Sequence, residues 1–458
     1  MTGLHLLIPE YLLLAGAIAA LFIERVSGRE GAGAALGAVV ALAAAIAAVV
    51  IGAQGAIAGG MLALDAVAVT VRVAIAALTA VYLLWLVGRG MGPERSREAV
   101  AFVLFAALGS MLMASARDLI VLFISLELAT MPAYVLMGYR RNDERNLEGA
   151  LKYFLLSMTT SLILLYGLSF LFGIAGSTSL VAIAAAPPAG LLGTFASVFV
   201  FIGLFAKMSA APFHFWAPDA YAGAPAGSVA FVSTVPKLAG TAVMVNLATA
   251  LVPHAPVLPA VLALAAVTSM LLGNLAAFPQ TDIRRLMAYS GVAHTGYVLL
   301  ALSSATPAGY AAAVFYTIAY VVPSMAITLI AAEEGTALDD LAGLVVRRPA
   351  VAWGSVVLLL SLVGVPPMAG MLGKLFAFTA AVSAGRLALV IVAVVMSVVS
   401  AGYYFRILRP IFFASRSDAP VLASSRSAAV AFSLLVAATL ALGIAASPLL
   451  SYLGVRFF

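Results

Sequence analysis

Long apolar runs with almost no charge are the feature of this sequence that most constrains its fold. Only 9% of the 458 residues are charged and 64% are hydrophobic, whereas a soluble domain carries about 25% charged residues. An α-helix needs ~20 apolar residues to cross a bilayer, and the runs have that length. They lack the alternating polarity of membrane β-strands. The sequence therefore predicts an all-α, polytopic membrane protein that lies in a lipid bilayer.

Polar or Gly/Pro-rich breaks divide these runs into about 14 predicted transmembrane helices. The first run ends at Glu24–Arg25 without a small-residue cleavage site, so we interpret it as a helix and not as a signal peptide. The predicted spans cover residues 4–24, 31–54, 65–88, 98–115, 118–139, 147–173, 191–217, 225–252, 256–278, 283–303, 307–332, 351–381, 386–411 and 427–447.

The arginines support this count and predict the orientation. If the N-terminus lies outside, the loops after odd-numbered helices face the cytoplasm, and these loops hold 16 of the 20 arginines. Arg117, Arg386 and Arg456 fall on the other side, and Arg72 lies within a span. The positive-inside rule predicts such a division, so we expect both termini outside. The loop expected at 218–224 carries only Asp219 and is an exception.

The four lysines differ from the arginines because they lie within apolar spans. A lysine at the bilayer centre costs about 2.5–3.5 kcal/mol, and buried ionisable residues usually mark ion or proton pathways. Lys207, Lys237 and Lys374 are therefore candidate functional residues. Lys152 lies about two turns from an arginine-rich loop, so an equally acceptable interpretation is that its ammonium reaches the membrane surface.

Glu127 is the only acidic residue that we expect well inside the first six helices. A buried carboxylate stays charged when it faces an ammonium group, and we expect it to pair with a lysine. The alternative is a protonated glutamate bonded to backbone.

Prolines are expected to interrupt the helices that carry the lysines. Pro212 follows Lys207 by five residues, Pro236 precedes Lys237, and Pro366–Pro367 precede Lys374. Proline removes a helical hydrogen bond, and the freed carbonyls are tolerated at membrane depth where they line an enclosed, hydrated cavity.

The interrupted spans occupy matching places in two groups of helices. Spans four to eight and spans nine to thirteen each form five helices with the break in the fourth, and an odd number makes the second group inverted. We thus expect three N-terminal helices (1–97), a first repeat (98–252), an inverted second repeat (253–413) and a C-terminal helix (414–458).

Several other function classes have no support in the residues. The chain has no cysteine for iron–sulfur or zinc ligation, its four histidines lack metal-ligand spacing, and no Gly-rich nucleotide motif follows a strand-like run. The arginine-rich loops account for the net charge of +6, so nucleic acid is not an expected partner.

Several stretches between residues 117 and 413 resemble the antiporter-like subunits of respiratory complex I, and within that family the subunit N branch. The resemblance rests on LELATMPAYVLMGYRR, FAKMSAAPFHFWAPDAYAGAPAGSVAFVSTVPKLAG, NLAAFPQTDIRRLMAYSGVAHTGY and SLVGVPPMAGMLGKLFAF. It favours N because the chain stops about ten residues after its last span, without the lateral helix of subunit L, and because Lys374 stands where subunit M usually has a glutamate.

The resemblance implies a proton relay made of the fifth-helix glutamate, the seventh-, eighth- and twelfth-helix lysines, a polar relay group and a sixth-helix lysine. These positions correspond to Glu127, Lys207, Lys237, Lys374, His294 and Lys152. It also implies a bacterial inner-membrane subunit without a cofactor of its own, with flavin, iron–sulfur clusters and quinone in partner subunits.

The implied partners are the antiporter-like subunit M, the small subunits K and J, and the lateral helix of subunit L. Two rival interpretations stay open. An Mrp-type or stand-alone cation/proton antiporter subunit would share the fold and the charges. A membrane scaffold would use the charges only to hold helices together, although polar contacts between membrane helices average only ~0.6 kcal/mol.

Overall fold

A computed structural model describes residues 3–29, 31–88, 96–140, 142–185, 190–414 and 425–455. Five of the arginines used to predict the orientation lie outside the described residues: Arg89, Arg95, Arg141, Arg416 and Arg456. In the described part, 13 helices are long and apolar enough to cross a membrane, and two shorter apolar helices together form the interrupted twelfth span. The predicted all-α polytopic fold is confirmed.

The chain is almost entirely helical, with one short antiparallel hairpin formed by β1 (Gly55–Ile57) and β2 (Leu62–Leu64). The α-helices are α1 (Ile8–Ser27), α2 (Ala32–Ile51), α3 (Ala66–Leu86), α4 (Ser96–Ser115), α5 (Leu119–Met137), α6 (Glu144–Ala175), α7 (Leu180–Ala185), α8 (Gly190–Lys207), α9 (Trp216–Gly223), α10 (Ala226–Val232), α11 (Val235–Leu251), α12 (Leu258–Ala277), α13 (Ile283–Ser303), α14 (Pro307–Glu334), α15 (Leu344–Arg347), α16 (Pro349–Val363), α17 (Ala369–Ser383), α18 (Leu387–Phe413), α19 (Arg426–Ile444) and α20 (Ala446–Tyr452).

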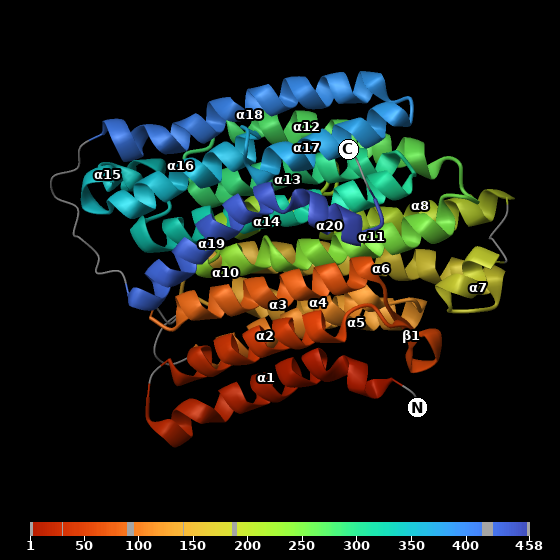
Figure 1. Cartoon of the computed structure of the whole chain (residues 1–458), viewed down its shortest axis with the longest axis horizontal. Helices are drawn as coiled ribbons and strands as arrows, with labels where there is room; N and C mark the ends of the chain where they lie inside the picture. Colours follow the sequence, from red (N-terminus) through yellow and green to blue (C-terminus); the bar gives the residue numbers. More distant parts are fainter. Residues whose placement is uncertain are drawn as a thin grey trace.

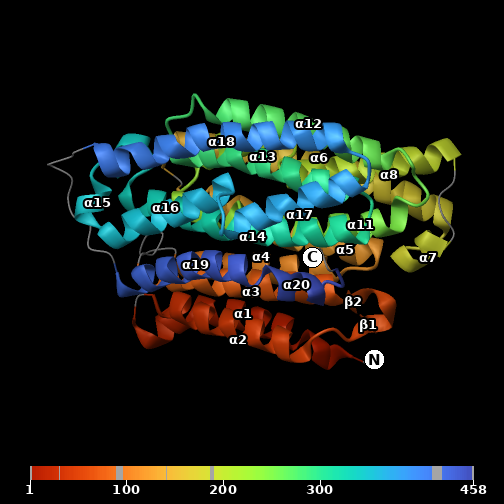
Figure 2. The same cartoon turned by 45° about the horizontal axis from the view of Figure 1, so that its top comes forward.

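The long helices lie side by side in a single bundle. Helices α1 and α2 form one edge, and α12 and α18 form the opposite edge (Figure 1). The view in Figure 2 shows the same order, with α14 between these edges. Helix α14 is buried along its whole apolar window, whereas only 33% of the α2 window and 22% of the α19 window are buried, as expected of helices that face lipid.

Aspartates set the start of several helices. The carboxylates of Asp65, Asp118, Asp143 and Asp282 accept hydrogen bonds from backbone N–H groups in the first turns of α3, α5, α6 and α13. Such caps satisfy donors that the helix leaves unpaired. Four of the acidic residues therefore mark where a span begins.

Ion pairs join the arginine-rich connections at one end of the bundle. Arg97 at the start of α4 lies 3.8 Å from Glu24 at the end of α1, and Arg285 lies 2.9 Å from Asp219 of α9. The β-hairpin lies at the opposite end from α15, as Figures 1 and 2 show. The side of the membrane that each end faces stays a prediction, as do the inverted relation of the two repeats and the domain boundaries.

The predicted interruptions near Pro212 and Pro366 are confirmed. Helix α8 ends at Lys207 and α9 begins at Trp216, while α16 ends at Val363 and α17 begins at Ala369. One expectation was wrong in detail, because residues expected to form a loop at 218–224 belong mostly to α9. The interruption expected at Pro236 within the 225–252 span is present, since α10 ends at Val232 and α11 begins at Val235 with Pro236 in its first turn.

Candidate functional site

Glu127 on α5 and Lys207 at the end of α8 lie next to each other inside the bundle. Lys207 Nζ is 4.0 Å from Glu127 Oε1, and the side chains are 8% and 12% exposed. Each charge has a hydrogen bond to a serine of α6. Lys207 donates to Ser157 Oγ at 2.7 Å, and Ser161 Oγ donates to Glu127 Oε1 at 2.6 Å.

Close packing of α6 against α8 brings Lys207 to this place. A Cβ on Gly203 would lie 2.6 Å from Leu164 Cβ, and a Cβ on Gly167 would lie 2.8 Å from the backbone nitrogen of Val200. Small residues let membrane helices approach in this way. The contacts run antiparallel along the two helices, and the next contact in the row is Lys207 on Ser157.

A small cavity separates Lys207 from Lys237 of α11. Its volume is about 30 Å³, and both lysines line it together with Ser157, Tyr153 and Tyr221. A water molecule needs roughly 10–15 Å³ of such space and two or more polar partners. The cavity is therefore large enough to hold water between the two ammonium groups.

Lys237 is buried between α11 and α13. Its Nζ donates to the Gly291 carbonyl at 3.2 Å and lies 5.5 Å from the centre of the Tyr320 ring. The imidazole of His294 stacks on the same Tyr320 ring, at a centroid distance of 4.4 Å. Tyr320 thus contacts both Lys237 and His294.

His294 has a hydrogen-bond partner on each ring nitrogen. Nδ1 lies 2.8 Å from the Tyr316 hydroxyl, and Nε2 lies 3.0 Å from the Tyr404 hydroxyl. The Tyr404 hydroxyl also shares a 2.5 Å hydrogen bond with Ser290. A neutral imidazole donates from one nitrogen and accepts at the other, so this arrangement can take a proton on one side and give one on the other.

Lys374 of α17 uses the interruption before its helix. Its Nζ donates to the carbonyls of Val363 at 2.7 Å and Leu362 at 3.2 Å, which the end of α16 leaves free, and to Ser397 Oγ at 2.7 Å. It also lies 5.2 Å from the centre of the Tyr297 ring. A cation at a helix C-terminus is favoured by the exposed carbonyls.

The structure therefore brings five of the six predicted residues into one buried row, ordered Glu127, Lys207, Lys237, His294 and Lys374. It does not bring Lys152 into that row. Lys152 is 45% exposed and pairs with Glu148 at 2.7 Å and Asp219 at 3.2 Å. This placement agrees with the interpretation that its ammonium reaches the membrane surface.

Reasoning from the sequence missed the tyrosines and serines that connect the row. Tyr316, Tyr320 and Tyr404 come from α14 and α18 and meet only when those helices pack on α13. It also missed a second buried acid. Glu10 is 3% exposed and pairs with Arg72, so Glu127 is not alone among the acidic residues buried in the first six helices. Arg72, a charged residue within a predicted span, was the signal in the sequence that could have indicated this buried pair.

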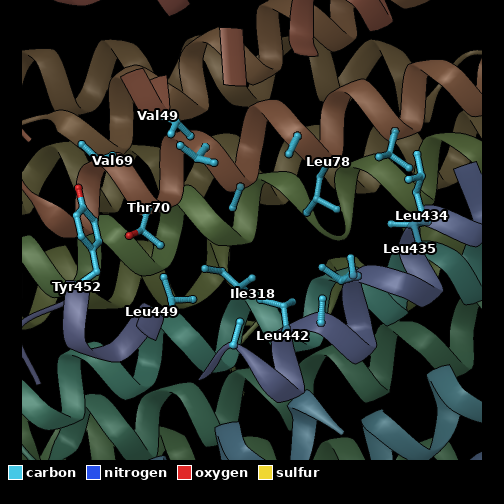
Figure 3. A pocket seen from close by; sticks show the side chains of 18 residues that line it. Val49, Val69, Thr70, Leu78, Ile318, Leu434, Leu435, Leu442, Leu449 and Tyr452 are labelled. Atoms are coloured by element: carbon cyan, nitrogen blue, oxygen red, sulfur yellow. The ribbon is translucent and has the colours of Figure 1, made fainter. Parts of the chain in front are cut away.

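The larger cavities lie elsewhere. An apolar groove of about 570 Å³ is bounded by α3, α14, α19 and α20, and Figure 3 shows its lining, including Leu78, Ile318 and Leu442. None of the charged residues of the row lines it. Among the described residues, no group of three or more His, Asp or Glu side chains could hold a metal ion.

The fold and this row of buried charges define an antiporter-like membrane protein. The family described as NADH:quinone oxidoreductase/Mrp antiporter, transmembrane, matches residues 116–400, and the chain belongs to this family.

Curated relatives carry the name of one subunit. The chain is 40% identical over 369 residues to "NADH-quinone oxidoreductase subunit N 2" of Solibacter usitatus, covering 78% of this chain and 75% of the relative. It is 37% identical over 433 residues to "NADH-quinone oxidoreductase subunit N" of Sphingopyxis alaskensis, covering 91% and 90%.

Solved structures share the fold over nearly the whole chain. A chain of respiratory complex I from Thermus thermophilus with bound aureothin is 32% identical, with a TM-score of 0.85 and coverage of 97% and 99%. A chain of the Mrp complex from Dietzia sp. has a TM-score of 0.86 and coverage of 99% and 97%, but only 22% identity, so that likeness shows the fold alone.

Proposed function

We propose that this chain is a proton-translocating membrane-arm subunit, of the subunit N type, in an NADH:quinone oxidoreductase. The observation that carries the proposal is the buried row from Glu127 to Lys374, in which neighbouring groups are joined by hydrogen bonds, aromatic contacts or a water-sized cavity. Buried ionisable groups are costly in a membrane and usually serve transport. The names of the curated relatives support the assignment to this enzyme.

Proton movement begins at the Glu127–Lys207 pair. The carboxylate stabilises the ammonium while the two lie close together. When they separate, the ammonium loses this stabilisation and one N–H proton of Lys207 can pass to a water in the adjoining cavity. That water gives a proton to the neutral amine of Lys237 on the other side.

The second half of the row continues from Lys237 to Lys374. His294 takes up a proton at one ring nitrogen and releases one from the other, with the Tyr316 and Tyr404 hydroxyls as its neighbours. Lys374 is held at the end of α16, where free carbonyls and Ser397 stabilise its charged form. We assign it to the exit side of the row.

The partners follow from this assignment. The chain carries no cysteine that could ligate an iron–sulfur cluster, and we propose that the flavin, the iron–sulfur clusters and the quinone site belong to partner subunits. We propose contacts with the antiporter-like subunit M, the small subunits K and J, and the lateral helix of subunit L. We also propose a bacterial inner-membrane location with both termini on the periplasmic side, since the arginine-rich loops then face the cytoplasm.

The Mrp-type antiporter subunit is the second candidate, because it shares the fold. The relatives named as subunit N and the 32% identity to a chain of complex I favour the first. Isolating the complex and identifying the subunits that co-purify with this chain distinguishes the two. Quinone-site and iron–sulfur subunits support our proposal, and cation-antiporter subunits contradict it.

A pair of variants tests whether Glu127 and Lys207 form a switch or a scaffold. Glu127→Gln leaves a buried ammonium without its partner, and breaking a buried pair costs about 3–5 kcal/mol. The double change Glu127→Gln with Lys207→Met leaves no unpaired charge. Protons pumped per quinone reduced are measured in vesicles with equal amounts of assembled complex.

The switch and the scaffold predict opposite results in this experiment. If the pair is a switch, the double variant assembles at least as well as Glu127→Gln, but pumping does not return. If the charges only hold helices together, the double variant recovers both assembly and pumping. Full recovery of pumping would contradict the proposal.

A further inference from the structure

Two serines on one face of α6 each contact one charged group of the Glu127–Lys207 pair. Ser157 and Ser161 are one helical turn apart, and residues four apart project from the same face of a helix. Ser157 Oγ accepts from Lys207 at 2.7 Å, and Ser161 Oγ donates to Glu127 at 2.6 Å. The direct distance between the two charged atoms is 4.0 Å.

At that distance the carboxylate and the ammonium attract each other without a direct hydrogen bond, because N–H···O bonds span about 2.7–3.2 Å. A serine hydroxyl can both donate and accept. A serine can therefore donate a hydrogen bond to a carboxylate or accept one from an ammonium group. Glu127 and Lys207 therefore each have a serine as hydrogen-bond partner, although only a small movement would bring the two charged groups into direct contact.

Neither serine is exposed to solvent. Both are buried on α6, at 3% and 2% exposure. The close approach of α6 to α8 at Gly203 and Gly167 fixes Ser157 opposite Lys207. The position of Ser157 relative to Lys207 is therefore set by the packing of α6 on α8.

We propose that Ser157 and Ser161 are positioning residues that keep the Glu127–Lys207 pair at this intermediate separation. A direct charge-assisted hydrogen bond would be short and strong, and it would hold the two charges together. With the serines in place, the carboxylate and the ammonium each keep a hydrogen-bond partner when the pair separates. This inference rests on the proposed proton-translocating function.

Ser157→Ala tests the inference in the assembled complex. It removes the acceptor at 2.7 Å and leaves only the Ser157 carbonyl, which lies 3.3 Å from Lys207 Nζ. Hydrogen bonds to charged groups are worth about 1.5–3 kcal/mol. We expect proton pumping coupled to quinone reduction to slow by about tenfold, and Ser157→Thr, which keeps the hydroxyl, to restore most of the rate.

Tyr134→Phe is the matched control. The Tyr134 hydroxyl donates to the same Ser157 oxygen at 2.8 Å, so this change perturbs the serine's surroundings but keeps its bond to Lys207. A smaller effect than that of Ser157→Ala is expected. An equal effect would mean that packing around Ser157 matters and not its contact with the lysine, which would overturn the inference.

A double variant shows whether the serine acts through the pair. Residues that share one network have non-additive effects. In a Glu127→Gln background, Ser157→Ala should cause no further loss, because the separation it controls no longer exists. Independent, multiplying losses would overturn the inference.

Failure of this inference is distinct from failure of the proposed function. If Glu127→Gln and Lys207→Met slow pumping but Ser157→Ala and Ser161→Ala pump like the parent complex, only the role of the serines is refuted. If all four variants pump normally, the proposed function itself is refuted.

Discussion

The buried Glu10–Arg72 pair allows a prediction whose magnitude follows from the structure. Arg72 on α3 is fully buried, and its Nε and Nη2 donate to the two carboxylate oxygens of Glu10 on α1 at 2.8 and 2.6 Å. Nη2 also donates to the Leu6 carbonyl at 3.3 Å. The perturbations are Glu10→Gln, Arg72→Met and the double change Glu10→Leu with Arg72→Met.

The two single changes should differ in cost. Removing one partner of a buried pair costs about 3–5 kcal/mol, because the other charge is stranded. A guanidinium cannot lose its proton in a protein, whereas a carboxylate can gain one and become neutral. Glu10→Gln should therefore approach the upper end of that range and Arg72→Met the lower end. The double variant should lie near the parent chain, because an apolar replacement of a buried pair is often neutral.

Thermal stability measures these differences. The temperature at which half of the chain aggregates is determined for each variant in detergent-extracted membranes at equal protein concentration. We expect the largest fall for Glu10→Gln, on the order of 5 °C for a chain of this length, and the smallest for the double variant. A double variant that is as unstable as Glu10→Gln would refute the reasoning, because it would show that the pair itself, and not a stranded charge, determines stability.

Three further predictions concern packing, topology and the histidine. Gly167→Leu should reduce assembly, because a Cβ there meets the backbone of α8, whereas Gly173→Leu on the same helix has no atom within 4 Å and should assemble normally, as blue-native gels can show. A reporter active only in the cytoplasm should work when inserted at residues 336–343 and fail at residues 58–61, and the reverse pattern would overturn the orientation. His294→Leu should slow quinone-coupled pumping in assembled complexes, because it removes both contacts to tyrosine hydroxyls, and a normal rate would remove the imidazole from the row.

The number of spans and their interruptions could be predicted because they depend on local sequence. Hydrophobic length sets a crossing, and Pro212 and Pro366–Pro367 remove backbone donors whatever surrounds them. The interruption at Pro236 follows the same rule, since α10 ends at Val232 and α11 begins at Val235 with Pro236 in its first turn. The break itself falls at Ser233 and Thr234, where the side chain of Thr234 bonds back to the Ala230 carbonyl at 2.6 Å.

The charged members of the site could also be predicted, since a lysine or glutamate inside an apolar run is conspicuous in the sequence. Their connections could not. Tyr404 meets His294 across 110 residues, and Ser157 meets Lys207 across 50. Tyrosine and serine are common in membrane helices, so only the packing of α13 with α18 and of α6 with α8 distinguishes these residues from others of their type.

Lys152 illustrates the opposite case. Its position in an apolar run resembles that of the buried lysines, but the first turns of α6 lie at the arginine-rich end of the bundle, where Glu148 and Asp219 are available as partners. The distance from the loop, and not the hydropathy of the run, distinguishes it from Lys237.

The most direct test of proton transfer along the buried row, called the proton row below, compares the same substitution at Lys237 and at Lys152. Lys237→Met and Lys152→Met each delete one ammonium and keep an unbranched apolar side chain of similar length, but only Lys237 is buried beside the cavity that it shares with Lys207. Protons pumped per quinone reduced are measured in vesicles that contain equal amounts of assembled complex. The proton row predicts a clear loss for Lys237→Met and near-parental pumping for Lys152→Met. Parental pumping by an assembled Lys237→Met complex would contradict it.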